Sequence, residues 1–366
     1  MKRLSLSTFA VVLVASLLLA ACGSTPTPEP VGQAAGITVV DALGRTVEFA
    51  EPPQRIVVAG RSSLTLIETL YLFAEAKDRV EGIGTGKQNP GDFLAFVDPT
   101  FEDKSKLAPD VGPEQIAPLN PDVVIVRSFM AESLGMPLEE LDIPVVYLDL
   151  ETPEQYFRDV GILGQLFGNE ARAEEIKAFY QERLDKIDSA LQGLGDSEKP
   201  RALVVQYSDQ GGEVALNVPS ATWLQTIEAE LAGATPVWVE AAQAGGWTVV
   251  NFEQIAAWDP DKIFVIHYAA NASDIVDQLE ADPQWQALRA VQAGEIYGFA
   301  GDIYSWDQPD PRWILGVTWL AERLHPEQFA DLDMKEEASL FFQEMYGMDA
   351  ASVQEQILSK LKGDVQ

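Results

Sequence analysis

Hydrophobic stretches of strand length alternate with stretches of helical spacing over residues 37–150. Two β-rich segments, 37–40 and 46–49, flank a turn at Asp41–Gly44 and predict a short hairpin. The apolar residues between Leu64 and Leu72 keep helical spacing, and strands are predicted at 55–59, 80–86, 123–126 and 145–148. Such alternation is typical of a parallel sheet with helices on its faces, so residues 37–150 are predicted to form one α/β lobe.

A different pattern occupies residues 151–195. Thr152-Pro153-Glu154-Gln155 has the residue order of a helix start, and Gly168-Asn169 then interrupts the helical spacing. An amphipathic helix is predicted over Ala171–Leu191, with apolar positions at Ala173, Ile176, Tyr180, Leu184, Ile187 and Leu191. At 1.5 Å per residue this helix would be roughly 30 to 35 Å long, enough to reach from one domain to the next.

A second lobe is predicted over residues 196–330, and a helical tail over 331–366. The segment Glu114–Asp122 (EQIAPLNPD) returns as Glu253–Asp261 (EQIAAWDPD), and each copy runs directly into a hydrophobic strand. Two copies so far apart indicate two similarly built lobes, because a solenoid would repeat every few tens of residues. The sequence therefore predicts an α/β protein with two Rossmann-like lobes bridged by one long helix, and a solute-binding cleft between the lobes.

The N-terminus predicts export from the cytoplasm. Lys2 and Arg3 precede an apolar run to Ala21, which is typical of a secretory signal peptide over residues 1–21. Small residues lead to Cys22, the only cysteine in the chain, as in the lipidation site of bacterial lipoproteins. Residues 22–36 hold several prolines with Ser and Thr, which is typical of a flexible tether. We expect an extracytoplasmic protein that lipid on Cys22 anchors to a membrane.

The charge and the residue types narrow the possible functions. The formal net charge of −32 disfavours nucleic acid or an anionic membrane surface as a partner, since both need basic patches. With one cysteine and two histidines the chain offers no thiol nucleophile and little scope for a resident metal site. Motifs of hydrolases, nucleotide-binding loops and dinucleotide-binding folds are absent from the sequence. An enzyme is therefore not expected, although a secreted hydrolase that uses carboxylates remains an alternative.

Candidate ligand-binding residues follow from the predicted strands, because ligands of open parallel sheets bind beyond the carboxyl ends of the strands. A lobe that offers Arg and Lys, facing a lobe rich in Tyr and Trp, would suit a large, flat or chelated anion. The candidates are Arg61, Lys87 and Arg127 in the first lobe, and Tyr207, Trp247, His267, Tyr268, Tyr304 and Trp306 in the second.

Two interpretations remain open for His267-Tyr268. The pair could ligate iron, for example in haem, or the imidazole could form a hydrogen bond within a loop. Arg312 is expected to be a structural hydrogen-bond donor, and Trp319 a core residue.

The chain resembles the extracytoplasmic solute-binding proteins of ATP-driven importers for ferric siderophores, haem and cobalamin. The resemblance spans about residues 37–330. It rests on Asp41–Arg45, Pro53–Val57, Val111-Gly112 with the first repeat copy, the bridging helix, the second copy, and the segments Trp285–Leu288, Ala290-Val291 and Gly294–Tyr297.

This resemblance implies a class III solute-binding fold and a monomer that passes one solute to a permease dimer with its ATPase. No cofactor of its own is implied; the ligand would be a ferric siderophore, haem or a corrinoid. The resemblance also implies that Glu114 and Glu253, one in each lobe, form salt bridges with arginines of the permease. Helix-dipole stabilisation alone, worth about 0.3 to 1 kcal/mol, is the alternative explanation for these two residues.

Two departures from the family pattern leave the solute open. Ala108 stands where relatives often carry an aromatic residue, whereas Trp247 keeps the aromatic of the second lobe. Arg127 also replaces a common aromatic residue, which favours an anionic ligand. An oxyanion such as molybdate or tungstate, or a role as a ligand-sensing surface receptor, are therefore the alternatives.

Overall fold

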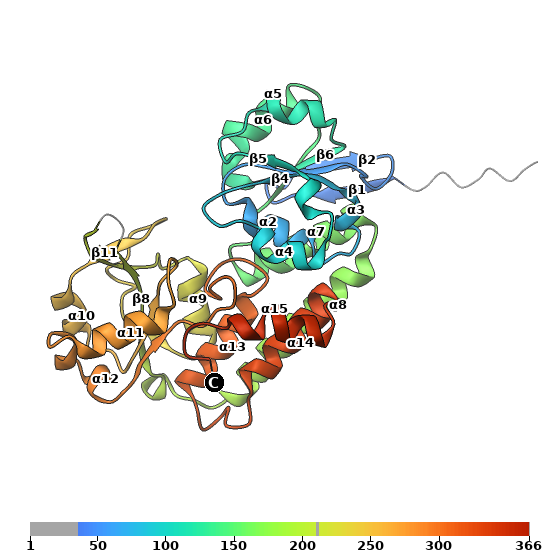
Figure 1. The fold of residues 1–366 in the computed structure, drawn as a ribbon. Helices are drawn as coiled ribbons and strands as arrows, with labels where there is room; N and C mark the ends of the chain where they lie inside the picture. The colour runs from blue at the N-terminus through green and yellow to red at the C-terminus, as the bar shows by residue number, and fades with distance from the viewer. Residues whose placement is uncertain (1–35, 210–211, 366) are drawn as a thin grey trace, which may run out of the picture. The chain divides into compact units, whose positions relative to one another are not determined.

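The computed structural model describes residues 36–209 and 212–365 (Figure 1). The predicted signal peptide, Cys22 and the tether as far as residue 35 lie outside these residues. Within the described part of the chain, no helix combines the length and the hydrophobicity needed to cross a membrane.

The first lobe is built on a sheet in which every strand pairs in parallel with its neighbours, as predicted. Its strands are short and rich in buried valine and isoleucine, which suits a sheet covered on both faces. The strand order is β5 (Ser105–Leu107), β4 (Val80–Gly84), β3 (Ile56–Val58), β6 (Val123–Arg127) and β7 (Val145–Leu148). The predicted hairpin of β1 (Ile37–Val40) and β2 (Thr46–Phe49) is confirmed as a separate antiparallel pair.

Helices connect the strands of the first lobe. The sequence predicts α2, and it predicts the short α5 because Pro113 suits the first turn of a helix. The helices of this lobe are α2 (Ser63–Leu70), α3 (Ala76–Arg79), α4 (Gly91–Val97), α5 (Pro113–Ile116) and α6 (Met136–Glu139).

The second lobe has a mixed sheet, which differs from the prediction of two similarly built, Rossmann-like lobes. β8 pairs in parallel with β12 and β10, but antiparallel with β9, and β9 pairs antiparallel with β11. The strands are β8 (Arg201–Ser208), β9 (Ala215–Val218), β10 (Thr235–Pro236), β11 (Thr248–Val250), β12 (Lys262–Ile266) and β13 (Ile296–Gly298). The helices are α9 (Leu224–Leu231), α10 (Phe252–Trp258), α11 (Ala272–Ala281), α12 (Arg289–Gln292) and α13 (Trp313–Leu324).

The predicted bridge between the lobes is confirmed as α8 (Glu170–Ala190), preceded by α7 (Pro153–Phe167). Thr152 and Asn169 cap these helices by accepting hydrogen bonds from the backbone N–H groups of Gln155 and Arg172. Near the start of α8, Arg172 donates to the carbonyl of Leu72 in the first lobe. The far end of α8 packs near α9 of the second lobe. The helix is 21 residues long, which corresponds to about 30 Å.

The C-terminal helices α14 (Met334–Tyr346) and α15 (Ala350–Gln356) confirm the helical prediction for this region, but α14 is not a loose tail. Phe342 and Tyr346 of α14 pack edge-on against Phe93 of the first lobe, with ring centroids 5.4 and 4.7 Å apart. The first lobe is thus completed by residues from the other end of the chain.

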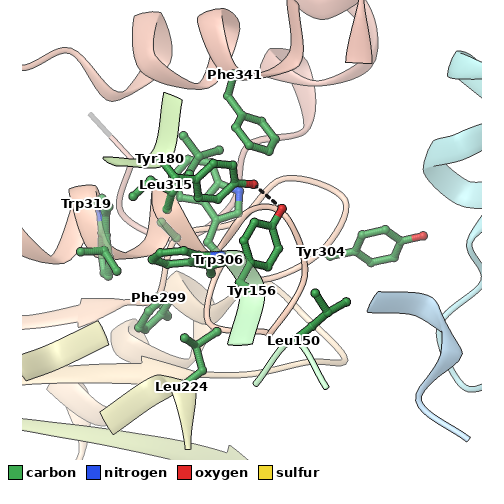
Figure 2. Packing of buried hydrophobic residues seen from close by; sticks show 14 of the residues in the cluster. Leu150, Tyr156, Tyr180, Leu224, Phe299, Tyr304, Trp306, Leu315, Trp319 and Phe341 are labelled. Carbon is green, nitrogen blue, oxygen red and sulfur yellow. Dashed lines mark hydrogen bonds between the residues drawn. The ribbon is translucent and has the colours of Figure 1, made fainter. Parts of the chain in front are cut away.

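One continuous hydrophobic core runs through both lobes. In its centre the hydroxyl groups of Tyr156 (α7) and Tyr180 (α8) face each other at 2.8 Å (Figure 2). The Tyr180 hydroxyl also lies 2.5 Å from the carbonyl oxygen of Pro311, to which it donates. Because the lobes share this core, residues 37–366 form one compact unit.

Candidate functional site

A cleft of about 990 Å³ opens between the two sheets. Its lining comes from the loops that follow β3 and β4 in the first lobe and β8 and β12 in the second, as expected for the carboxyl ends of parallel strands. Of the residues predicted to bind ligand, the cleft brings together Arg61, Lys87, Tyr207, Trp247, His267 and Tyr268.

The first lobe contributes the cations of the cleft. Arg61 and Lys87 are exposed, and neither forms an ion pair with a carboxylate among the described residues. The Arg61 guanidinium lies 5.8 Å from the ring centre of Phe129, itself more than half exposed. Glycine is required nearby at Gly84, because a Cβ there would lie 2.2 Å from the Ser63 hydroxyl. The loops after β3 and β4 therefore come close together. Because Arg61 and Lys87 have no ion-pair partner among the described residues, both can contact an anion in the cleft.

The second lobe contributes an aromatic wall. Trp247 stands edge-on to Trp223, with ring centroids 5.6 Å apart, and edge-on to Tyr268 at 6.4 Å. Tyr207 lies against the His267 ring, with centroids 6.1 Å apart. This wall offers apolar ring surface opposite the two cations.

The hydrogen bonds of His267 decide which of its nitrogens carries the proton. Nδ1 accepts a hydrogen bond of 2.8 Å from the backbone N–H of Ala270, so the proton of the neutral imidazole is on Nε2. A metal on Nε2 would need the proton on Nδ1, where it would face the Ala270 N–H. Nε2 lies 3.6 Å from Asp209 Oδ1. Of the two interpretations of His267, this geometry favours the hydrogen bond within a loop.

Tyr268 has its hydroxyl engaged inside the protein. The hydroxyl donates to Asp307 Oδ2 at 2.6 Å. Burial first, and then the Asp307 charge, raise the pKa of Tyr268 well above its ordinary value, so the phenol stays protonated at neutral pH. Tyr268 therefore presents its ring to the cleft rather than a phenolate.

The structure corrects the predictions for Arg127 and Trp306, since neither lines the cleft. Arg127 ends β6 as expected, but its side chain is 1 % exposed; it donates to Thr65 and pairs with Glu151. Burial lowers the pKa of Arg127 to about 10, so it remains a cation that is already neutralised within the lobe. Trp306 is fully buried and donates its indole N–H to Asp302 at 2.8 Å.

Tyr304 lies beside the cleft rather than in it. Its ring borders a cavity of about 60 Å³ behind the His267–Ala269 segment. The ring points away from the core toward the first lobe, where its hydroxyl donates to the carbonyl of Asn89 (Figure 2). Tyr304 is thus a contact between the lobes.

Several cleft residues were not predicted. Asn217 lines the cleft because β9 pairs antiparallel with β8. The candidates were chosen at the ends of predicted parallel strands, and Asn217 does not lie at such an end. Gln308 lies in the loop after β13, two residues after the predicted Trp306. Gln206 is a polar residue within β8, one position before Tyr207, and this was the signal available for it.

The two repeat copies have matching local structure. The Gln115 and Gln254 side chains accept from the backbone N–H groups of Gly112 and Asn251, at 3.2 and 3.0 Å, as in a capping box. Both short helical segments end in a left-handed residue, Asn120 with φ 49° and Asp259 with φ 42°. Most of the repeated residues therefore have a structural role in forming or ending these short helices.

The repeated glutamates are different, because the fold does not use their carboxylates. Glu114 and Glu253 are exposed and make no hydrogen bond or ion pair with another described side chain. Each follows a cleft-lining residue closely, Pro109 in the first lobe and Trp247 in the second. One exposed, repeated glutamate thus stands on each lobe.

A buried charge network joins the lobes behind the cleft. Arg312 is fully buried, pairs with Glu68 of α2, and donates to Asp302 at 3.0 Å. Asp310, 3.8 Å from Arg312, is also fully buried. Arg312 is therefore structural, as expected. No group of three or more acidic, histidine or cysteine side chains in the described ranges is arranged to hold a metal ion.

Comparison with known proteins identifies the family. A family model described as periplasmic binding protein matches residues 74–302. The chain belongs to the periplasmic binding protein family. Members of this family are solute-binding proteins of ABC transporters and not enzymes, which confirms the predicted fold class and the prediction that the chain has no catalytic function.

Relatives of this periplasmic binding protein match it over most of their length. It is 24% identical to the molybdate-binding protein MolA of Haemophilus influenzae, with 84% of this chain and 90% of that protein covered. It is 25% identical to an iron-uptake system-binding protein of Bacillus subtilis, over 81% of this chain and 90% of that protein. A periplasmic solute-binding protein of Veillonella parvula has the same fold, with a TM-score of 0.70 at 20% identity, over 88% and 97% of the two chains.

Proposed function

We propose that this binding protein is a lipid-anchored, extracytoplasmic receptor that captures a ferric chelate in its interlobe cleft and delivers it to the permease. The observation that carries the proposal is the composition of the cleft, which has a volume of about 990 Å³: Arg61 and Lys87, which have no ion-pair partner among the residues that the structure describes, line it together with Trp247 and Tyr268. Clefts of this size suit ligands as large as drug molecules or small chelates. A siderophore offers both an anionic shell for the cations and flat groups for the rings.

Neither member of the His267-Tyr268 pair is arranged as a metal ligand, which supports a chelate that already fills the coordination sphere of its metal. His267 has its tautomer fixed by Ala270, and the Tyr268 phenol stays protonated. This also disfavours haem held by axial ligation from this pair. The relative named for iron uptake supports the same substrate class.

An oxyanion such as molybdate is the second candidate, because MolA is a relative and the two cations suit an oxyanion. A tetrahedral anion would fill only a small part of the cleft and would leave the aromatic wall without a contact. This is why the chelate is preferred.

Delivery requires contact with the permease, for which we propose Glu114 and Glu253. Their carboxylates are free to pair with arginines, and one stands on each lobe, as a two-subunit permease requires. Anchoring through Cys22 and a monomeric state complete the proposal.

The decisive experiment is native mass spectrometry of protein purified from its own host, followed by calorimetric titration with ferric citrate, a ferric trihydroxamate, haemin, a corrinoid and molybdate. We expect a retained iron chelate and binding of at least one ferric chelate. Tight binding of molybdate with no binding of any chelate would overturn the chelate proposal. Normal solute uptake in a strain that lacks this protein would instead favour a sensory receptor.

A further inference from the structure

Tyr268 stands out among the cleft residues because its exposed ring is tied to a buried carboxylate by a hydrogen bond from its hydroxyl. It follows the end of β12, on a loop, and 41 % of the residue is exposed. Its ring touches Trp247 edge-on, which restrains the ring only weakly. The bond from its hydroxyl to Asp307 is the contact that reaches into the protein interior.

Asp307 is itself held in place by burial and by a second hydrogen bond. Asp307 is fully buried, and its Oδ2 accepts from both the Tyr268 hydroxyl at 2.6 Å and Gln225 Nε2 at 3.2 Å. Gln225 lies in the first turn of α9, two residues after Trp223, whose ring forms the other end of the aromatic wall. Asp307 therefore joins α9 and the loop after β12 by accepting a hydrogen bond from each.

We infer that Asp307 is a positioning residue for solute binding: it anchors the Tyr268 hydroxyl inside the second lobe and so fixes the Tyr268 and Trp247 rings as one surface of the cleft. This inference rests on the proposed function of the cleft and adds a residue that does not touch the solute. Glu228 stands behind Asp307, fully buried and without a hydrogen-bond partner for either carboxylate oxygen among the described residues. Burial, and then the Asp307 charge, raise the pKa of Glu228 well above its usual range. Burial also raises the pKa of Asp307, whereas its hydrogen bonds from Tyr268 and Gln225 act in the opposite sense and favour the carboxylate.

The test compares variants that keep or remove the acceptor. Asp307→Asn retains a carbonyl oxygen for the Tyr268 hydroxyl, whereas Asp307→Leu has a similar shape and no acceptor. Tyr268→Phe keeps the ring and removes the donor. The control is the Tyr71 hydroxyl, which donates to buried Asp98 at 2.8 Å away from the cleft. Tyr71→Phe removes an equivalent bond and should alter stability but not binding.

Two measurements are needed. NMR of protein with isotope-labelled tyrosine, with the Tyr268 signal assigned from Tyr268→Phe, reports the environment of the hydroxyl without any ligand. Calorimetry with ferric citrate and a ferric trihydroxamate reports affinity. We expect Asp307→Asn to keep the Tyr268 signal and to bind within about twofold of the wild type. Asp307→Leu should shift the signal, and Asp307→Leu and Tyr268→Phe should each weaken binding by about tenfold. The double variant should bind no more weakly than either single variant, because both remove the same bond.

Three results would overturn the inference: an unchanged Tyr268 signal in Asp307→Leu, a shifted signal with unchanged affinity, or losses that multiply in the double variant. If Asp307→Leu does not fold, Tyr268→Phe and Gln225→Leu test the same anchor, and wild-type affinity in both would contradict it. If the wild type binds neither ferric probe, the proposed function fails, whereas the NMR comparison still decides whether Asp307 positions Tyr268. Affinity is then measured with the solute that native mass spectrometry identifies.

Discussion

Arg61 and Arg127 occupy equivalent places in the sequence pattern, just past or at the end of a buried strand of the first lobe, yet their surroundings differ. Arg61 faces the cleft without a carboxylate partner in the described part of the chain, whereas Arg127 is buried against Glu151 and Thr65. The sequence locates both strand ends, because runs of valine and isoleucine are easy to recognise. It does not reveal which way a long side chain turns, since that depends on Glu151 and Thr65, which are distant in the sequence.

At this scale we expect Arg61→Ala and Trp247→Ala each to weaken solute binding by about 1.5 to 3 kcal/mol, through a lost charge contact and lost ring burial. Arg127→Ala is the matched comparison. It should leave affinity nearly unchanged and lower the free energy of unfolding, because it leaves the Thr65 hydroxyl and the Glu151 carboxylate without their partner. Calorimetry and chemical denaturation of the three variants measure these effects. Wild-type affinity in both Arg61→Ala and Trp247→Ala would place the solute elsewhere.

Among the elements, the two repeated segments were the most predictable part of the fold. Their capping glutamines, left-handed Asn120 and Asp259, and following Pro-Asp all have local causes that are visible in the sequence. In both lobes the closing aspartate accepts backbone N–H groups from the start of a neighbouring strand, Asp122 from Arg55 and Asp261 from Arg201. The antiparallel pairing of β9 and β11 was missed, because short strands that pair across a long loop leave only a weak pattern along the chain.

The repeated glutamates lead to a prediction about transport. Glu114→Ala and Glu253→Ala should leave solute affinity unchanged and lower the transport rate, and the double variant should show the larger loss. The physical reason is that each substitution removes one proposed ion pair with the permease. Both pairs can form at once because α8 joins the lobes through continuous backbone hydrogen bonds and so keeps the two carboxylates at a nearly constant separation. Calorimetry and uptake into vesicles that contain the permease measure the two effects separately. Glu327→Ala, at an exposed glutamate in the loop after α13, is the control; undiminished transport in the double variant would rule out docking through these residues.

For the molecule as a whole, the buried carboxyl groups predict an unusual dependence of stability on pH. Burial raises the pKa of Asp310 to about 7 and that of Glu68 to about 8, and it raises the pKa of Glu228 well above its usual range. The folded state then binds more protons than the unfolded state between about pH 4 and pH 8. The free energy of unfolding should therefore fall as pH rises through this window, by at most about 1.4 kcal/mol per pH unit for each group.

Chemical denaturation at pH 5 and pH 8 checks this expectation. Glu228→Gln should be more stable than the wild type at pH 8 and should show a smaller difference between the two pH values, whereas Glu327→Gln should behave as the wild type does. His325 acts in the opposite sense, since burial lowers its pKa, but it is the same in both variants and cancels in the comparison. An identical pH dependence in Glu228→Gln and the wild type would show that Glu228 does not titrate in this window.

The packing of α14 on Phe93 also sets an order of events in time. During synthesis the first lobe leaves the ribosome long before Phe342 and Tyr346 exist, so Phe93 of α4 lacks these two packing partners until nearly the whole chain has been made. An incomplete chain therefore cannot finish the packing of its first lobe. If the predicted signal peptide directs export, this delay would help the chain to cross the membrane before its first lobe is fully packed.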